Sequence, residues 1–182
     1  MKQKLFVIPE FVTAADIKEI RRQLGLTQKE FAALIHTSQS TIERWEMGSE
    51  NIKGPIVTLL QLLERHPEYV EQIKVPQKRY PIRLEYMHEN AVCTIIDVDE
   101  IRQLVHIKNY TDNLMFRAFG KNDNPTYGEY QEFLESRCFP RSRDKMKLIL
   151  QDLDLPFYDP FMIIEKTEGR MAEDSFWIRI ER

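Results

Sequence analysis

The chain has 182 residues, of which 42% are hydrophobic, so it is long enough to bury the cores of one or two globular domains. A net charge of only −3 excludes a protein that attracts nucleic acid through a strong overall basic field. The charge is unevenly divided, because residues 1–80 carry 12 Lys and Arg against 10 Asp and Glu, whereas residues 81–182 carry 14 against 19. Any contact with DNA is therefore expected in the first half and must depend on local geometry.

The cysteines and the apolar runs bear on the cellular compartment. Cys93 and Cys138 are the only cysteines and lie far apart in sequence, which favours a reducing environment over a disulfide scaffold. The first residues, MKQKLFVIPEFV, contain an apolar run too short for a signal peptide. No later stretch approaches the roughly 18 apolar residues of a membrane span. We therefore expect a cytoplasmic protein with no membrane partner.

The first 75 residues have the hydrophobic period of helices, and each of five expected helices has a start signal. The first is expected over about 14–24, the second ends near His36, the third ends at Gly48 and the fifth reaches Ile73. Two starts fit capping boxes, one is a serine cap, and two helices open at proline. These starts are Thr13 with Asp16, Thr27 with Glu30, Ser38, Pro55 and Pro67.

The pattern changes after residues 74–81, KVPQKRYP, whose two prolines and three basic residues predict a linker. Three β-rich runs follow, at 82–88, 91–98 and 103–110, and short polar turns between them predict an antiparallel meander. Helical periodicity returns from Thr126, and the tail FWIRIER is a candidate last strand. The sequence thus predicts an α+β protein with an all-α domain over 1–78 and an α+β domain with a small antiparallel sheet over 79–182.

Residues 25–48, GLTQKEFAALIHTSQSTIERWEMG, have the spacing of a helix-turn-helix, in which a short helix and a tight turn precede a second helix that can enter the major groove. Ile42 and Trp45 would bury the rear of the second helix and leave its front exposed. The pattern resembles the XRE/Cro-type repressor family, which carries G-L-T-Q-x-E-φ-A followed by S-x-x-x-I-x-x-W-E-x-G. The resemblance implies a lambda-repressor-like fold and a sequence-specific DNA-binding regulator.

The resemblance also implies roles for individual residues. Gln28 matches the glutamine that binds a backbone phosphate, and Gln39, Ser40 and Arg44 fall where the family reads bases. Thr41 would contact a phosphate or a thymine methyl group. The implied DNA-binding set is Gln28, Ser38, Gln39, Ser40, Thr41 and Arg44. Arg21 and Glu46 match a structural ion pair that joins the first helix to the end of the recognition helix.

Two positions depart from the family pattern. His36 stands where the family usually has Gly, at a turn position that often takes a left-handed conformation, so a distorted turn is expected. The proline that usually follows the final glycine is displaced to Pro55, and KGPIVTLLQLLERHPE is similar to the fourth-helix stretch of HigA-like antitoxins. That similarity implies an antitoxin of a type II toxin-antitoxin system that represses its own operon. Its partners would be operator DNA, a second copy of the chain and a cognate toxin.

Catalytic and metal sites are not favoured in the second half. Cys138 would be a nucleophile if Arg137, Arg141 and Arg143 stabilised its thiolate, but no base accompanies it, so a core or interface cysteine is preferred. The four histidines, His36, His66, His88 and His106, have no spacing typical of metal ligands. Asp97 and Asp99 suit a turn at a strand end and not a calcium loop. We expect no enzyme activity, metal or cofactor.

Three other features of the second half have both structural and functional interpretations. The first is an expected basic helix edge made of Arg141, Arg143, Lys145 and Lys147, which is either a solvated face or a contact surface. The second is the pair of patterns R-x-x-P-x-x-R and G-x-x-x-x-D-x-x-W, formed by Arg137, Pro140 and Arg143 and by Gly169, Asp174 and Trp177. These are similar to segments that accompany HipA-type toxin kinases, which implies docking of a kinase-like toxin. The third is the apolar run FYDPFMII, a core segment or an interaction patch.

Two alternative functions remain open from the sequence. In one, the helix-turn-helix is fused to a small-molecule-sensing or enzymatic C-terminal domain. In the other, a degenerate helix-turn-helix serves a protein-interaction adaptor, which the acidic overall charge favours. Salt-dependent DNA binding would count against the adaptor.

Overall fold

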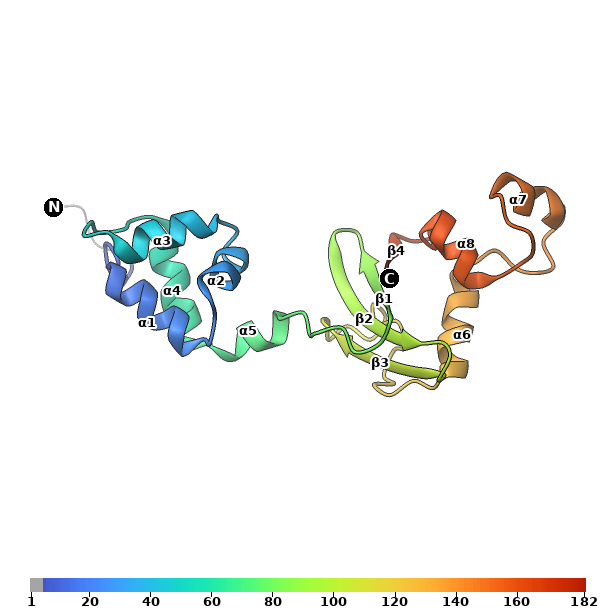
Figure 1. The fold of residues 1–182 in the computed structure, drawn as a ribbon, viewed down its shortest axis with the longest axis horizontal. Coiled ribbons are helices and arrows are strands. Elements are labelled where there is room, and N and C mark those ends of the chain that lie inside the picture. The colour runs from blue at the N-terminus through green and yellow to red at the C-terminus, as the bar shows by residue number, and fades with distance from the viewer. Residues whose placement is uncertain (1–4) are drawn as a thin grey trace. The chain divides into compact units, whose positions relative to one another are not determined.

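The computed structural model describes residues 5–182, and Figure 1 traces its helices and strands. Contacts between residues divide the chain into two compact units, with the division between Val75 and Pro76. The N-terminal unit is helical, and the C-terminal unit combines helices with a four-stranded antiparallel sheet. The predicted α+β class and the small antiparallel sheet are therefore confirmed.

Five helices lie in the described part of the N-terminal unit, residues 5–75, and their start signals are those read from the sequence. The side chains of Thr13 and Thr27 each accept a hydrogen bond from the backbone three residues on, and both capping boxes are complete. Ser38 caps the third helix by accepting from the Thr41 amide, and the fourth opens at Pro55. The helices are α1 (Ala14–Gln23), α2 (Gln28–Leu34), α3 (Gln39–Met47), α4 (Pro55–Arg65) and α5 (Glu68–Ile73).

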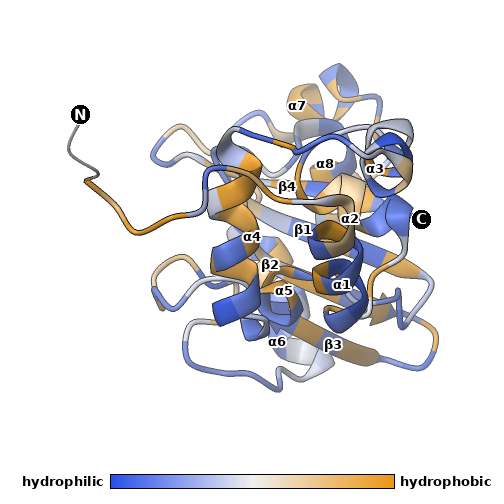
Figure 2. Ribbon diagram, turned by 90° about the vertical axis from the view of Figure 1, so that its left-hand side faces the viewer, coloured by the Kyte–Doolittle hydropathy of each residue, from blue (hydrophilic) through white to orange (hydrophobic). Residues whose placement is uncertain are grey.

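One apolar core holds these helices together. Ile17 of α1, Phe31 of α2 and Ile42 of α3 are completely buried, and Leu60 of α4 joins them. Trp45 is partly buried against the same cluster. Figure 2 shows the hydrophobic stretch along α4 that supplies one wall of this core. Burial of residues from four helices fixes their packing, because each buried aliphatic or aromatic side chain contributes roughly 1.5–3 kcal/mol relative to its exposed state.

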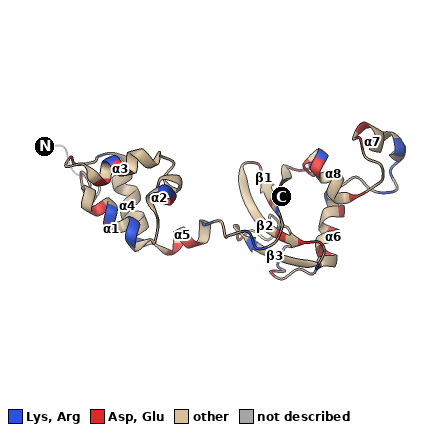
Figure 3. Ribbon diagram, viewed as in Figure 1, with Lys and Arg blue, Asp and Glu red and all other residues tan. Residues whose placement is uncertain are grey.

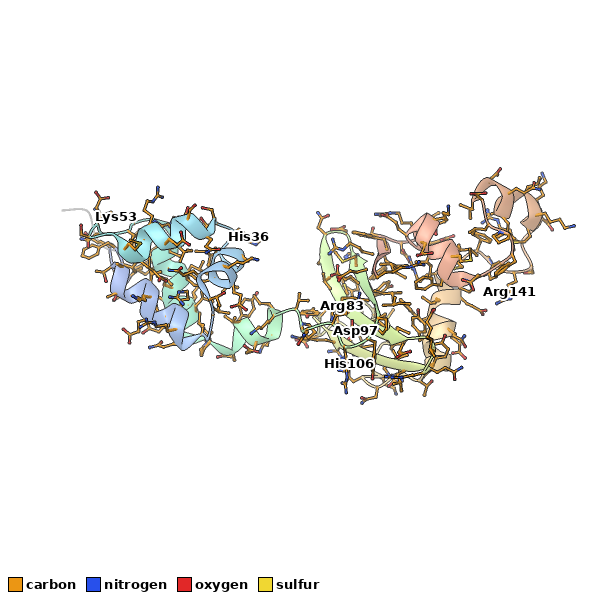
Figure 4. All side chains as sticks on the ribbon, viewed as in Figure 1. His36, Lys53, Arg83, Asp97, His106 and Arg141 are labelled. Atoms are coloured by element: carbon orange, nitrogen blue, oxygen red, sulfur yellow. The ribbon has the colours of Figure 1, made fainter. Side chains whose placement is uncertain are left out.

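The turn between α2 and α3 passes through His36, which is labelled in Figure 4. His36 has φ +53°, so this exposed histidine adopts the left-handed conformation itself. Its backbone amide still bonds to the Ala33 carbonyl, and the Thr37 amide bonds to the Ala32 carbonyl. His36 thus takes the left-handed conformation expected at this position, and because it is not glycine this conformation costs local backbone strain.

The C-terminal sheet has the strand order β3-β2-β1-β4, with all neighbours antiparallel. The first three strands form the predicted meander. The predicted last strand also forms, and it pairs with β1, with Leu84 opposite Ile180. The strands are β1 (Ile82–His88), β2 (Ala91–Asp99), β3 (Leu104–Asn109) and β4 (Phe176–Glu181).

Helices α6 (Tyr127–Ser136) and α8 (Pro160–Thr167) supply the core beside the sheet, and α7 (Met146–Asp152) has no buried residue. The capping box at Thr126 starts α6, where helical periodicity was predicted. Helix α8 was not predicted. It takes up the run FYDPFMII, in which Asp159 caps the helix, while Ile163 and Ile164 enter the core. Core packing is thus the role of this run's helical part, although Phe157 is 59% exposed.

The opposite face of the sheet carries a buried ion pair. Arg83 and Asp97 are cross-strand partners in β1 and β2 and are only 4% and 1% exposed. Two parallel hydrogen bonds of 2.7 and 2.8 Å join them, and Figure 4 labels both side chains. The expectation that Asp97 suits a turn is wrong, since it lies inside β2, whereas Asp99 does accept a hydrogen bond from the Arg102 amide in a turn.

This pair also anchors the segment predicted as a linker. The Arg83 guanidinium donates to the Pro76 carbonyl at 3.0 Å, and the Arg79 amide donates to the Asp97 carboxylate at 2.7 Å. Lys78 donates to the Glu181 carbonyl of β4. Residues 76–79 are therefore part of the C-terminal unit, because their backbone completes the hydrogen bonds of the buried charges.

The basic helix edge predicted from Arg141, Arg143, Lys145 and Lys147 does not form. Helix α7 begins at Met146, so only Lys147 of the four is helical, and Lys145 has a left-handed conformation just before the helix. Arg141 instead pairs with Glu135 of α6. The prediction failed because charges spaced by four residues indicate a shared helix face only where the segment is helical.

Candidate nucleic-acid interface

Helix α3 has a buried side and an exposed side. Ile42 is completely buried and Trp45 is partly buried, so these two residues fix the helix against the core. Gln39, Ser40 and Arg44 are exposed on the remaining surface. Within residues 5–182, no carboxylate forms an ion pair with the Arg44 guanidinium. The helix thus presents an amide, a hydroxyl and a free guanidinium, which are groups able to bond to base edges.

A cluster of hydroxyl groups surrounds the start of α3. The Ser38 Oγ atom accepts a hydrogen bond from the Thr41 amide and lies 2.8 Å from the Thr41 hydroxyl. It also lies 2.9 Å from the Ser40 hydroxyl. These contacts satisfy the Thr41 amide and hold three hydroxyls at the positive end of the helix dipole, where phosphate oxygens are favoured.

An ion pair joins the end of α3 to α1. The Arg21 Nε and Nη2 atoms donate to the Glu46 carboxylate at 2.6 and 3.0 Å, and their side chains are 12% and 3% exposed. Arg21 Nη1 donates to the Leu26 carbonyl at 2.8 Å, which ties in the turn before α2. The hydrogen bonds from Arg21 hold the pKa of Glu46 below its usual value, against the effect of burial. A bidentate pair of this kind restricts the orientation of α3 relative to α1.

Gln28 belongs to the same network. Its Nε2 atom donates to Glu46 Oε2 at 2.9 Å, so the side chain at the start of α2 is held against the end of α3. The bond uses one of the two amide protons, and the half-buried side chain retains a second proton and its carbonyl oxygen for another partner. No sequence signal indicated this bond, because the two residues lie 18 positions apart.

Gln39 has an intrahelical partner that sequence reasoning also missed. Its Nε2 atom donates to Glu43 Oε1 at 2.8 Å, one turn along α3. The bond uses one of the two amide protons, and bidentate pairing with adenine needs only the carbonyl oxygen and one amide proton. The spacing of four residues was visible in the sequence and is a known signal for such pairs. Glu43 therefore restrains the orientation of the Gln39 side chain.

Arg137, Gly169 and Asp174, which belong to the two patterns in the second half, meet around the buried Arg137 guanidinium, whereas Pro140 and Arg143 are exposed. Arg137 is 7% exposed, and its guanidinium bonds to the Gly169 carbonyl, the Asp174 carboxylate and the Phe176 carbonyl. Asp174 lies 2.6 Å from Arg137 Nη1, and these hydrogen bonds hold its pKa below its usual value. Gly169 has φ +59°, and an added Cβ would lie 3.3 Å from the Arg137 Cβ. This part of the pattern has a structural role in closing α6 against β4.

The cysteine hypothesis does not fit the geometry. Cys138 is 5% exposed, and burial raises the pKa of its thiol to about 12, while the opposing influence of Arg137 is weaker. Its Sγ atom donates to the Pro160 carbonyl at 3.5 Å. A thiol with this pKa is protonated at neutral pH and is a poor nucleophile. Among residues 5–182, no group of three or more His, Cys, Asp or Glu side chains is arranged to hold a metal ion.

Comparison with known proteins places the similarity in the helical unit. Residues 3–74 match the family model described as the antitoxin component MqsA of bacterial toxin-antitoxin systems. Residues 3–74 are antitoxin-like. Antitoxin HigA-2 of Vibrio cholerae serotype O1 is 42% identical over 62 residues, which are 34% of this chain and 60% of that protein. Antitoxin MqsA of Escherichia coli K12 is 31% identical over 68 residues, which are 37% of this chain and 48% of that protein.

These matches confirm the resemblance to helix-turn-helix antitoxins and define its extent. The chain spans about half to three-fifths of the length of the two antitoxins it matches. The matched family model ends at residue 74, one residue before the boundary between the two units. In the part of the chain that the structure describes, no helix is both long enough and apolar enough to cross a membrane.

Proposed function

We propose that this protein is a sequence-specific DNA-binding regulator and an antitoxin that represses its own operon. The observation that carries the proposal is the construction of α3, whose apolar side is buried while Gln39, Ser40 and an unpaired Arg44 face outward. The antitoxin-like character of residues 3–74 supports the same function. The small net charge is compatible with it, because a local contact set can supply specificity without an overall basic field.

In this proposal the residues divide into reading and positioning groups. Arg44 reads guanine through two hydrogen bonds, and Gln39 reads adenine through its amide. Gln28 and the hydroxyls of Ser38, Ser40 and Thr41 contact phosphates, which set the register of α3 on the duplex. The Arg21–Glu46 pair does not touch DNA but fixes the orientation of the reading helix.

We propose that two copies pair, so that two recognition helices meet a twofold-related operator. An apolar hollow of about 320 Å³ on α4 and α5 is a candidate contact surface, lined by residues that include Leu59, Leu62 and Tyr69. Leu62 and Tyr69 are 53% and 54% exposed. Leu62→Glu should convert a dimer to a monomer in sedimentation, and an unchanged dimer would move the interface elsewhere.

The first experiment is fluorescence anisotropy of the full chain with DNA from the region upstream of its own gene. Arg44→Ala should weaken binding to the preferred site by about 1–3 kcal/mol and relax the base preference at one position. Arg65→Ala, which removes an exposed arginine at the end of α4, is the matched control and should bind as the wild type does. Unchanged sequence preference in Arg44→Ala would contradict the reading role.

The phosphate role of Gln28 has a different signature. Gln28→Ala should weaken binding to all sequences by a similar factor, because a phosphate contact carries no base information. Binding of the wild type should also weaken as salt rises. A loss confined to one base position would contradict the assignment, and no binding by folded wild-type protein would reject the DNA-binding function and favour the adaptor.

We propose that the C-terminal unit binds the cognate toxin. If so, a fragment of residues 1–78 should retain operator binding, whereas only the full chain should bind the toxin. Trp45 fluorescence checks that the fragment is folded, since this side chain packs on the N-terminal core. A folded fragment that retains toxin binding would assign the toxin surface to the helical unit instead.

A further inference from the structure

A cavity of about 510 Å³ lies in the C-terminal unit, lined by α6, by the segment that leads into α8 and by the residue that follows β2. Its aromatic walls are formed by Tyr127, Tyr130, Tyr158 and Phe161. This volume is within the range of pockets that hold small ligands. The cavity is separate from the proposed DNA interface, because all its lining residues belong to the C-terminal unit.

Tyr130 contributes a polar group with no partner. Its side chain is only 1% exposed, and within the described part of the chain its hydroxyl forms no hydrogen bond. Burial, with smaller effects from carboxylates that include Glu100 and Asp159, raises the pKa of Tyr130 above its usual value, so the phenol stays neutral. A buried hydroxyl without a partner is unfavourable, and its two lone pairs remain available to a donor that enters the cavity.

The charged groups around the cavity are mostly acidic. Four carboxylates line it, from Glu100, Glu132, Glu135 and Asp159, against the single guanidinium of Arg141. Figure 3 shows acidic segments recurring along α6. Burial and then the neighbouring Asp159 raise the pKa of Glu100, as expected where carboxylates repel one another. The cavity therefore attracts a cation.

The chain already holds one guanidinium group in the lining of this cavity and another against the outer side of one lining residue, Phe161. Arg141, labelled in Figure 4, donates to Glu135 at 2.8 Å and lies 4.6 Å from the centre of the Tyr158 ring. Arg182 pairs with Glu165 and lies 5.7 Å from the centre of the Phe161 ring. A carboxylate and an aromatic face together bind a cation in both cases.

Three carboxylates are left after these pairs are formed. Glu100, Glu132 and Asp159 make no ion pair within residues 5–182, although Asp159 accepts the Met162 amide as the cap of α8. Glu100 and Glu132 are exposed, and Asp159 is half-buried. Tyr130 is completely buried in the cavity wall, so the site combines accessible negative charge with an internal hydrogen-bond acceptor.

We propose that this cavity binds an organic cation, namely an ammonium or guanidinium group on a short aliphatic stem. The cation donates a hydrogen bond to the Tyr130 hydroxyl, its charge is balanced by Glu100, Glu132 and Asp159, and its stem packs on the aromatic rings. Such a group comes either from a free amine or from a Lys or Arg side chain of another protein. The proposal does not depend on DNA binding or on toxin binding.

Calorimetric titration of the full chain tests the site with four probes. Spermidine and argininamide are free cations, citrullinamide is an uncharged analogue of argininamide, and a blocked Gly-Ser-Arg-Ser-Gly peptide presents arginine as a side chain. At least one cationic probe should bind with a saturable isotherm, and citrullinamide should bind at least about tenfold more weakly than argininamide, because it lacks the charge. Equal binding of the two analogues, or no saturable binding of any cation, would overturn the proposal.

Two variants connect the binding to this cavity. Tyr130→Phe removes only the unpartnered hydroxyl and should weaken cation binding about three- to tenfold, the effect of one lost hydrogen bond. Glu132→Gln removes an exposed carboxylate of the lining and should weaken binding by at least about twofold, and more at low salt. Asp152→Asn removes an equal charge outside the cavity and should leave the Kd unchanged. Binding that is unaffected by both cavity variants would also overturn the proposal.

The same titrations distinguish the two sources of the cation. Tighter binding of spermidine or argininamide than of the blocked peptide supports a free amine. Tighter binding of the peptide supports a basic side chain of another protein. Either result supports the site only if Tyr130→Phe weakens the binding of the probe that binds more tightly.

Discussion

In the N-terminal unit, the carboxylate of Glu46 is shared between the Arg21 guanidinium and the Gln28 amide. In the C-terminal unit, Arg83 and Asp97 bond to each other and to backbone groups of residues 76–79. The first network includes a half-buried side chain that can take another partner, whereas the second is completely enclosed. The comparison indicates that the first arrangement orients α3, the helix proposed to read DNA, while the second holds the fold itself.

Removing one member of the enclosed pair should have the largest effect. Asp97→Ala leaves the buried Arg83 charge without a counterion, and the free energy of unfolding of the C-terminal unit should fall by about 3–5 kcal/mol. Urea denaturation followed by Trp177 fluorescence measures this unit, in a Trp45→Phe background. Asp112→Ala, which removes an exposed carboxylate, should cost less than about 1 kcal/mol. Equal effects of the two variants would mean that the enclosed pair does not hold the fold.

Arg137 is a second buried arginine of the C-terminal unit, and its hydrogen bonds should also stabilise the fold. Arg137→Lys keeps the charge but loses the planar fork that reaches Gly169 and Asp174, so the C-terminal unit should lose about 2–4 kcal/mol. The same denaturation experiment measures this loss. Arg170→Lys is the control, because Arg170 is 55% exposed in its pair with Glu168. A loss below 1 kcal/mol in Arg137→Lys would show that charge alone accounts for the contact.

The shared carboxylate of the N-terminal unit should give a smaller, pH-dependent effect. The pKa of Glu46 is lowered in the folded protein, so its contribution is complete above the usual glutamate pKa of about 4.3 and is lost as pH falls through the lower folded value. Glu46→Gln should lower the free energy of unfolding by about 1–3 kcal/mol at pH 7. Trp45 fluorescence in a Trp177→Phe background should show this difference narrowing between pH 5 and pH 3. A difference that does not depend on pH would contradict the ion pair.

The smallest expected effect tests local strain in the turn before α3. His36→Gly should stabilise the N-terminal unit by about 0.5–1 kcal/mol, because glycine adopts φ +53° without steric cost. The opposite change at another left-handed position, Gly25→Ala, has open space around the new methyl group and should destabilise by about 1 kcal/mol. Thermal unfolding measures both. A destabilised His36→Gly variant would show that the histidine side chain contributes more than its backbone strain costs.

The N-terminal unit was largely predictable because its signals are local. Thr13, Thr27 and Ser38 bond to backbone amides three residues away, so the helix starts could be read directly from the spacing. The exposed set on α3 also followed from helical periodicity once Ile42 was assigned to the core. The Gln28–Glu46 bond did not follow, since the two residues meet only when α1, α2 and α3 pack together.

The C-terminal unit was less predictable because distant residues decide it. Asp97 resembled a turn residue in sequence, and its burial depends on Arg83 across the sheet and on residues 76–79 beside it. Helix α8 was hidden in a proline-punctuated apolar run, and its two core isoleucines belong to a cluster that includes residues of β1 and β2, far earlier in the chain. The spacing of hydrophobic residues shows which side of a helix or strand will be buried, but it does not show which other element packs against that side.

By itself, the sequence determined the caps of the first three helices, the strand positions, the α+β class and the candidate reading set on α3, because each depends on contacts within a few residues. Only the tertiary structure decided that β4 pairs with β1, that Arg137 closes the second unit and that Tyr130 lies unpartnered beside a group of carboxylates. The first two features join residues separated by more than 30 positions, and the third joins Tyr130 to Glu100 and Asp159 as well as to carboxylates of its own helix. Their energies come from burial and from hydrogen bonds made when the elements pack together, which no local pattern records.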